Sequence, residues 1–349
     1  MKILVSKLRA LGDTVLLSST VALLKKQYPE AAITVLVPAA FRDVFYCNPQ
    51  VQELWCYEDQ SYFSLLWKVR KKKFDATFHF HSSDRMLWLS RFSGAFHNYI
   101  QFHNELEQRF VGKDTNALQW APRFLKREVK QWREDISVLP APRIFLTEQE
   151  KDWGKNFWQK RGADPKKVVF LGLGASRPTK IWPLEHFARF GELLRDRLEF
   201  IPAIIFGPGE EEAKNAAVLL GHLRVKGFRP QNGIHDNGGV IFQSGLSVRE
   251  LASVLSACRA YVGNDSGPKH LSAAVGIPTF TFFGPEDPNE WHPYPQTEHP
   301  LFFIPELKCR MEDGGRWCSI QNCINEKHKC MTKIDPLDVL EKFREVVQV

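Results

Sequence analysis

The feature that most constrains the fold is a regular alternation of short apolar segments with longer segments of helical spacing. In the first half, apolar segments occupy 2–6, 33–37 and 74–81, and the helical spacing covers 15–28. The second half repeats this alternation, with predicted strands at 168–171, 201–206, 260–262 and 278–283 and predicted helices at 184–194, 248–258, 268–275 and 337–347. Such an alternation predicts an α/β fold in which parallel sheets are covered on both faces.

A change of composition near 139–143 marks a domain boundary. The segment reads Leu-Pro-Ala-Pro-Arg, and two prolines this close favour an extended connection. We therefore predict an N-terminal domain at 1–142, a second domain at 143–335 and a terminal helix within 336–349 that packs back on the first domain. Two doubly wound domains that face each other form a cleft, and each sheet presents its strand-end loops to it.

The composition is that of a globular protein. Hydrophobic residues make up 44% and charged residues 25% of the 349 residues. No apolar run approaches the roughly 18 residues that a membrane-spanning helix needs. The apolar stretch at the N-terminus, Ile3 to Val5, is short for a secretory signal, so we expect a cytoplasmic protein.

The net charge of +7 favours partners that carry phosphate. The densest basic cluster follows Trp67 and comprises Lys68, Arg70, Lys71, Lys72 and Lys73. This cluster is either a solvated helix end or a contact with anionic lipid. No nucleic-acid recognition motif accompanies it, so nucleic acid is not predicted as a partner.

The chain has seven cysteines, and four of them lie near the C-terminus at 309, 318, 323 and 330, with His328 before the last. Their spacing lacks the C-x2-C pair of common zinc sites. We predict free thiols in a reducing cytosol and no metal or cofactor, while a metal site or a local disulfide stays an alternative for these four residues.

The most informative segment, at 261–270, is a strand, a polar turn and the start of a helix. Pro268 suits the first helical turn, Asp265 or Ser266 can cap the helix, and Gly267 allows a ligand to approach the backbone. Free amide groups at a helix N-terminus bind anions, and Lys269 and His270 add charge or hydrogen bonds, so a diphosphate is the expected ligand. An ordinary capped helix has the same pattern. The absence of Walker A and G-x-G-x-x-G patterns disfavours NTPases of the P-loop class and dinucleotide dehydrogenases.

Three further loops lie at predicted strand ends. The loop 172–183 offers Ser176 and Lys180 to phosphate oxygens. The helix after 207–209 opens with three glutamates, 210–212, of which Glu210 is our candidate for ribose hydroxyls, although all three also suit a solvated first turn. In the first half, Asp13 follows the first strand, where it is either a helix N-cap or a base that takes a proton from an acceptor hydroxyl.

Taken in order, several motifs resemble those of the ADP-heptose:lipopolysaccharide heptosyltransferases, glycosyltransferase family 9. They lie at 7–13, 174–183, 263–271, 276–278, 283–288 and 291–294, and the cysteine-containing tail is also similar. The resemblance implies a GT-B fold, that is, two Rossmann-like doubly wound parallel-sheet domains around a central cleft. It also implies inverting, metal-independent transfer of a heptose or related sugar from an ADP-sugar to a lipopolysaccharide core or similar lipid-linked oligosaccharide.

By this resemblance, Asp13 is the general base and Lys180 stabilises the departing diphosphate. The predicted donor site comprises Ser176, Lys180, Glu210, Asp265, Ser266, Gly267, Pro268 and His270. A lipid-linked acceptor would bring the protein to the anionic cytoplasmic face of the inner membrane.

The sequence departs from the family at two places. Relatives often carry Asp where this chain has His79 and His81, which would share one face of a strand; with Arg9 they are our candidates for acceptor contacts. Arg177 replaces a frequent aromatic residue. Two alternatives stay open: a sugar-nucleotide epimerase, which needs no acceptor, and a nucleotide-sugar-binding protein without a base, against which Asp13 and Lys180 argue.

Overall fold

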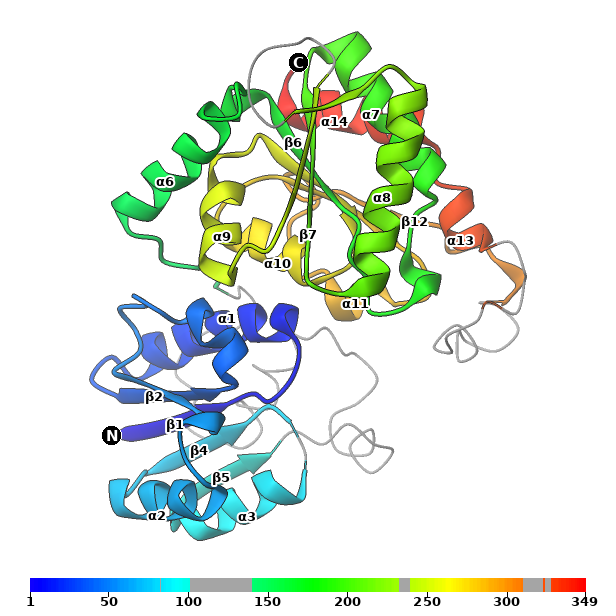
Figure 1. Cartoon of the computed structure of the whole chain (residues 1–349). Helices are drawn as coiled ribbons and strands as arrows, with labels where there is room; N and C mark the ends of the chain where they lie inside the picture. Colours follow the sequence, from blue (N-terminus) through cyan, green and yellow to red (C-terminus); the bar gives the residue numbers. More distant parts are fainter. Residues whose placement is uncertain (82, 101–139, 232–238, 310–322, 324–327) are drawn as a thin grey trace. The chain divides into compact units, whose positions relative to one another are not determined.

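The computed structural model describes residues 1–81, 83–100, 140–231, 239–309, 323 and 328–349 (Figure 1). Leu139 of the predicted boundary and Cys318 lie outside these residues. The chain divides into two compact units, Met1–Phe145 and Leu146–Val349. The predicted boundary lies three residues before this division.

The first unit is built on a parallel sheet of five described strands in the order β3-β2-β1-β4-β5. The strands are β1 (Lys2–Ser6), β2 (Ala32–Val37), β3 (Glu53–Cys56), β4 (Ala76–His79) and β5 (His97–Ile100). One face carries α1 (Leu11–Gln27), and the other carries α2 (Tyr62–Lys72) and α3 (Asp84–Ser93) (Figure 1). Short 3-10 helices follow β2, at Ala39–Val44, and β3, at Tyr57–Asp59. The strand order reverses between β1 and β4, which is the place where such sheets usually bind ligands.

The second unit has a parallel sheet of seven described strands in the order β12-β11-β10-β6-β7-β9-β8. The strands are β6 (Val168–Gly172), β7 (Ile201–Phe206), β8 (Arg229–Gln231), β9 (Gly239–Ser244), β10 (Ala260–Asn264), β11 (Thr279–Phe283) and β12 (Leu301–Phe303). The helices are α6 (Glu148–Gln159), α7 (Leu184–Leu198), α8 (Glu210–Val225), α9 (Val248–Ala257), α10 (Gly267–Ala274), α11 (Pro288–Trp291), α13 (Lys329–Thr332) and α14 (Pro336–Val347), with 3-10 turns at Pro165–Lys167 and Pro178–Lys180. The predicted fold class, two doubly wound α/β units with parallel sheets, is confirmed.

The terminal helix α14 belongs to the second unit. It buries Val339, Leu340 and Phe343 in the same core as α7, and the Phe343 ring packs against the rings of Phe190 and Phe280 at 6.2 and 5.1 Å. The predicted stripe of apolar residues fills the core between α7 and β11, so this side of the helix packs within the second unit, and its packing on the first domain stays a prediction.

The described residues contain no helix that is long and apolar enough to cross a bilayer. They also contain no group of three or more His, Cys, Asp or Glu side chains arranged to hold a metal ion. Among the described members of the C-terminal cysteine group, Cys309 and Cys323 carry free thiols.

Candidate functional site

The carboxyl ends of β6 and β10 approach each other closely because both carry glycine there. Gly172 and Gly263 are partners in the parallel pairing of the two strands. A Cβ atom on Gly263 would lie 2.4 Å from the Gly172 carbonyl oxygen, and one on Gly172 would lie 2.2 Å from the Tyr261 hydroxyl. Only glycine therefore fits at either place. The two loops that follow these strands consequently start side by side.

Asn264, at the end of β10, fixes the loop after β6. Its Oδ1 accepts a hydrogen bond from the Trp182 amide at 2.9 Å, and its Nδ2 donates to the Leu173 carbonyl at 2.9 Å. The Trp182 side chain is fully buried, and its Nε1 donates to the Ile334 carbonyl at 3.1 Å. The sequence did not single out Asn264. Its side chain nevertheless fixes the backbone at Trp182 and so determines where Lys180 lies, two positions earlier.

Asp265 is the centre of a buried charged cluster. Its Oδ2 lies 2.8 Å from the Lys180 ammonium and its Oδ1 lies 2.5 Å from the Lys269 ammonium. Lys269 is fully buried, and it also donates to the Trp291 carbonyl at 2.8 Å. Burial alone would raise the pKa of Asp265, but Lys269 and Lys180 more than offset it and hold this pKa below its usual range.

The cluster carries a surplus of one positive charge, because two ammonium groups share one carboxylate. The pKa of Lys269 is lowered by burial, an effect that Asp265 opposes. His270 does not add charge, because burial and then Lys269 lower its pKa well below 6.5. Its Nδ1 is hydrogen-bonded to the Tyr294 hydroxyl at 2.7 Å. A buried charge without a partner is costly, so the cluster favours an anion as a ligand.

The N-terminus of α10 supplies the other half of an anion site. Its N-cap residue, Ser266, makes no side-chain capping hydrogen bond. The prediction that Asp265 or Ser266 caps this helix is therefore wrong, since Asp265 pairs with the lysines and Ser266 lies 3.4 Å from the Tyr261 hydroxyl. Ser266, Gly267 and Pro268 are partly exposed, so a ligand can reach the amide groups of this turn.

The loop 172–183 brings both of its predicted residues to this edge of the sheet. Ser176 is exposed, and Lys180 ends the 3-10 turn Pro178–Lys180. Arg177 forms an ion pair with Glu286, in the segment after β11. The departure from the family at Arg177 therefore has a structural partner.

Of the three glutamates that open α8, Glu212 faces the strand ends. A Cβ atom on Gly174 or Gly207 would lie 3.0 or 3.1 Å from its carboxylate, and burial raises the pKa of this carboxyl although the Gly207 amide opposes the shift. The Glu210 side chain is 85% exposed and pairs with Lys214. The rotation of the helix decides this, because Glu212 comes two residues, or roughly 200°, after Glu210 and so points to the opposite side of α8. The structure therefore places Glu212, and not the predicted Glu210, at the strand ends.

In the first unit, Asp13 lies in the first turn of α1 and forms an ion pair with Lys7 at 2.8 Å. The N-cap position is Ala10, without a side-chain cap, so the alternative that Asp13 caps this helix is wrong. Arg9 is exposed and His81 is partly buried. Burial, Lys7 and Arg9 lower the pKa of His81, while Asp13 opposes them, so these four residues form one charged group at the ends of β1 and β4.

His79 differs from His81 in its surroundings. It ends β4 with its side chain fully buried, and its Nδ1 is hydrogen-bonded to the Ser6 hydroxyl at 2.6 Å. Burial lowers its pKa to about 3. The strand stops at His79, so the prediction that the two histidines share one strand face is wrong. His79 packs inside the unit and is not exposed to an acceptor.

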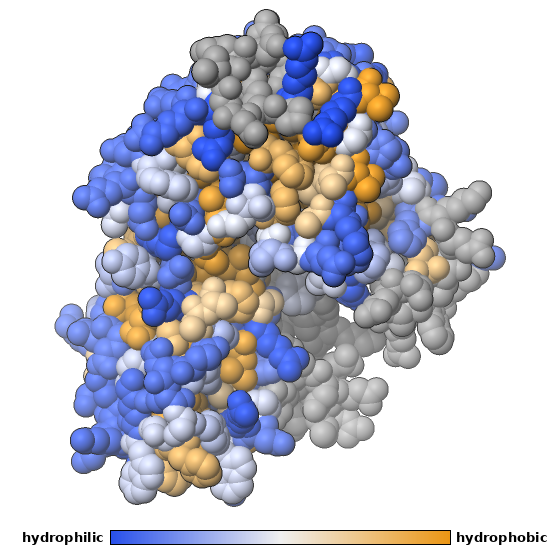
Figure 2. Space-filling model, viewed as in Figure 1, coloured by the Kyte–Doolittle hydropathy of each residue, from blue (hydrophilic) through white to orange (hydrophobic). Residues whose placement is uncertain are grey.

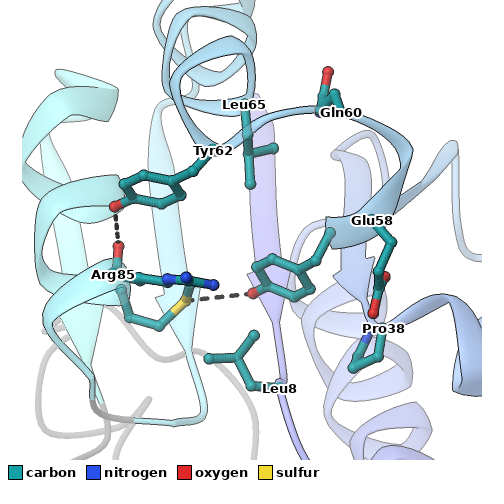
Figure 3. Close-up of a pocket in the computed structure, with 9 residues that line it drawn as sticks. Leu8, Pro38, Glu58, Gln60, Tyr62, Leu65 and Arg85 are labelled. Carbon is teal, nitrogen blue, oxygen red and sulfur yellow. Dashed lines mark hydrogen bonds between the residues drawn. The ribbon is translucent and has the colours of Figure 1, made fainter.

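A pocket of about 360 Å³ lies at the carboxyl edge of the first sheet (Figure 3). Leu8, Pro38 and Tyr57, which follow β1, β2 and β3, line it together with residues of α2 and α3. The Tyr62 hydroxyl donates to the Arg85 carbonyl at 2.6 Å, as Figure 3 shows. None of the lining residues was predicted, because they come from several segments far apart in sequence and, apart from Leu8, lie outside the motifs. Their mixture of rings, apolar groups and charges suits a polar ring compound such as a sugar.

Comparison with known proteins shows what the chain is similar to. The model of glycosyltransferase family 9 (heptosyltransferase) matches residues 113–311, more than half of the chain. Lipopolysaccharide heptosyltransferase 2 of Escherichia coli K12 is 25% identical over 83% of this chain and 84% of its own length. Lipooligosaccharide heptosyltransferase 2 of Campylobacter jejuni is 25% identical, and the match spans about half of either chain, 52%. The solved structure of E. coli ADP-heptose lipopolysaccharide heptosyltransferase II has the same fold, with a TM-score of 0.73 at 19% identity, covering 100% of this chain and 99% of that one.

Proposed function

Since the chain belongs to glycosyltransferase family 9, we propose that it transfers a heptose or related sugar from an ADP-sugar to a lipopolysaccharide core or similar lipid-linked oligosaccharide. The observation that carries the donor half of this proposal is the buried cluster of Lys180, Asp265 and Lys269, whose surplus positive charge lies beside the uncapped N-terminus of α10. A nucleoside diphosphate supplies the negative charge that this place favours.

In the proposed complex, the amide groups of the α10 turn and the Lys180 ammonium bind the two phosphates. Ser176 adds a hydroxyl at the same edge of the sheet, and Glu212 is in position to accept hydrogen bonds from the ribose. Asp265 does not contact the phosphates in this arrangement, because like charges repel. It orients Lys180 instead.

The proposed reaction inverts the anomeric centre and needs no metal ion. The acceptor hydroxyl oxygen attacks the anomeric carbon while the bond from this carbon to the diphosphate oxygen breaks, and ADP leaves with the electron pair. Lys180 and the α10 amides stabilise the charge that develops on the leaving group. Asp13, held by Lys7, takes the proton from the attacking hydroxyl. Because the hydroxyl attacks opposite the departing diphosphate, the configuration inverts.

The acceptor half of the proposal depends on the charged group around Asp13. Lys7 pairs with this carboxylate, Lys7, Arg9 and Asp13 all act on the pKa of His81, and the two basic residues suit an acceptor that carries anionic groups. A lipid-linked acceptor further implies that the reaction takes place at the cytoplasmic face of a membrane.

The experiment that tests the proposal is transfer by the Asp13→Asn protein. The full chain is incubated with a panel of sugar nucleotides and delipidated cell-envelope oligosaccharides, and products are read by mass spectrometry. We expect transfer from an ADP-sugar by the wild type, and a loss of about a hundredfold or more in Asp13→Asn with ADP binding retained. Asp84→Asn is the matched control, because Asp84 lies in the first turn of another helix, α3, of the same unit.

Three results would contradict parts of this proposal. Normal turnover by Asp13→Asn would remove Asp13 as the base. Failure of every ADP-sugar with success of a UDP-sugar would overturn the donor. Conversion of the donor sugar without any acceptor would indicate an epimerase.

A further inference from the structure

The outer surface of α2 and α3 is unusually rich in exposed aromatic rings. Phe63 and Trp67 lie four residues apart on α2, and Trp88 and Phe92 lie four residues apart on α3. Each pair therefore forms a stripe along one side of its helix. Phe63, Trp67 and Trp88 are 76%, 67% and 61% exposed. Phe96, just after α3, is the most exposed ring at 89%. We call these five residues the aromatic face.

The two stripes form one continuous surface. The Trp67 and Phe92 rings are in edge-to-face contact, with 5.8 Å between their centroids, so the stripes of α2 and α3 meet. The inner sides of the same helices fill the core with Leu65, Val69 and Leu89. Figure 2 shows orange and pale side chains at the surface at the lower end of the view, where Figure 1 places these helices. An exposed apolar patch of this size on a folded unit marks an interaction surface.

Basic residues border the aromatic face. Segment 61–97 holds seven Lys and Arg against two Asp, a net charge of +5 out of +7 for the whole chain. Lys71 continues the α2 stripe one turn beyond Trp67, and Arg91 lies beside Phe92; both are exposed. Lys68 and Lys72 are partly engaged, with Lys68 over the Trp55 ring and Lys72 paired with Glu53. The exposed basic groups next to the rings therefore include Lys71 and Arg91.

From this juxtaposition we propose that the aromatic face and its basic border dock the protein on an anionic lipid bilayer. The rings enter the interface between headgroups and acyl chains, where aromatic side chains are enriched, and Lys71 and Arg91 contact the headgroup phosphates. A second copy of the chain is a poorer occupant, because two faces of charge +5 repel each other. A single nucleic-acid strand also binds to aromatic rings beside basic groups, but it needs a groove that follows its backbone. The most exposed rings, Phe63 on α2 and Phe96 just after α3, are 76% and 89% exposed and do not line a groove.

The role of this docking surface, which is to bring the enzyme to a lipid-linked acceptor, rests on the proposed function, whereas the binding to lipid does not. Vesicle binding is measured without donor or acceptor. An inactive protein can therefore bind vesicles, and an active one can fail to bind them, so the two proposals fail independently.

The test is flotation of the full chain with two kinds of vesicle, one of phosphatidylcholine and one with roughly a third of phosphatidylglycerol. We expect wild-type protein to bind the anionic vesicles much more strongly and to dissociate as salt is raised. Lys71→Glu with Arg91→Glu should weaken this binding by at least roughly 30-fold, since the loss of each basic residue costs about fivefold and the two new carboxylates are repelled by the anionic surface. Trp67→Gln with Trp88→Gln should weaken binding to both kinds of vesicle.

The matched control is Trp153→Gln with Lys160→Glu in the second unit. It makes one substitution of each kind, at an exposed tryptophan of α6 and at the exposed lysine that follows this helix. The control should bind vesicles like the wild type. All variants should keep the thermal unfolding temperature and the transfer to a delipidated oligosaccharide, because the replaced side chains are exposed.

Several outcomes would overturn the proposal. Equal vesicle binding by wild type and both double variants would exclude this face, and so would an equal loss in the α6 control. Absence of wild-type binding to anionic vesicles would exclude the lipid. Sedimentation that shows a dimer dissolved by the aromatic substitutions would assign the face to a second copy. If the protein binds a single-stranded oligonucleotide but no vesicles, and the same variants lose this binding, the aromatic face would be assigned to nucleic acid.

Discussion

Lys269→Met removes one of the two ammonium groups that share the Asp265 carboxylate. Asp265 keeps its second partner, Lys180, at 2.8 Å, so the substitution leaves a one-to-one pair and no unpaired charge. Lys269 is fully buried, and methionine is similar in length and apolar. We therefore expect the free energy of unfolding to stay within roughly 2 kcal/mol of the wild-type value. Removal of Asp265 would differ, because it would leave two buried ammonium groups without a counter-charge.

The expected effect on nucleotide binding is larger, since the surplus charge of the cluster falls from one to zero. Both ammonium groups touch the same carboxylate, so a phosphate bound to Lys180 lies roughly 8 Å from the Lys269 ammonium. At an effective dielectric constant of about 20, the attraction between unit charges at this separation is about 2 kcal/mol. This corresponds to an affinity for ADP that is roughly 30-fold weaker.

The assay is calorimetric titration of the wild type and Lys269→Met with ADP, together with urea unfolding of both proteins. Lys214→Met is the matched control, because Lys214 is an exposed lysine of α8 in the same unit. Unchanged ADP affinity in Lys269→Met would refute the idea that the surplus charge attracts the ligand. A loss of more than about 3 kcal/mol in unfolding free energy would show that Lys269 supports the fold instead.

Two other substitutions test the packing inside each unit, Gly263→Ala in the second and His79→Gln in the first. Gly263→Ala places a methyl group 2.4 Å from the Gly172 carbonyl oxygen, so we expect a loss of about 3 kcal/mol or more in thermal unfolding, whereas Gly209→Ala, with nothing within 4 Å, should be tolerated. Burial holds the pKa of His79 at about 3, below its unfolded value, so its contribution to stability is complete above pH 6.5 and is lost as the pH falls. We expect His79→Gln to reduce the loss of stability between neutral pH and about pH 5 by about 2 kcal/mol in urea unfolding; an unchanged pH dependence would mean that His79 is not the group responsible.

The family and the fold class were predictable from the sequence because they depend on local order. The strands at 2–6 and 201–206 are dense in apolar residues, and their predicted bounds agree with β1 and β7. The ordered motifs indicated glycosyltransferase family 9, which the family model confirms. Two of the strands that escaped prediction are short and polar: β5 reads His-Asn-Tyr-Ile, and β8 reads Arg-Pro-Gln. Tertiary pairing outweighs local propensity in such segments.

The sequence indicated the turn and several side chains of the site, but not how these side chains pair. The turn before α10 is visible from Gly267 and Pro268, whereas the partners of its neighbours lie far away in sequence. Asn264 bonds to backbone groups 82 and 91 positions earlier, and Lys269 bonds to a carbonyl 22 positions later. Glu212 was not distinguishable from Glu210, because the choice depends on how α8 is rotated on the sheet. Contacts of this kind are set by packing between elements, which no local pattern encodes.

Asp265 is explained by the stability of the unit when no ligand is bound. A carboxylate next to a diphosphate weakens its binding, so on binding alone the residue is unfavourable. Without it, however, Lys180 and Lys269 would be two buried like charges in contact, and the unit would lose several kcal/mol of stability whenever no ligand is bound. One carboxylate for two ammonium groups satisfies both demands, since each cation keeps a partner and one positive charge stays uncompensated. In the proposed complex, a diphosphate neutralises the remaining positive charge, and when it leaves, each ammonium group still has the Asp265 carboxylate as its partner.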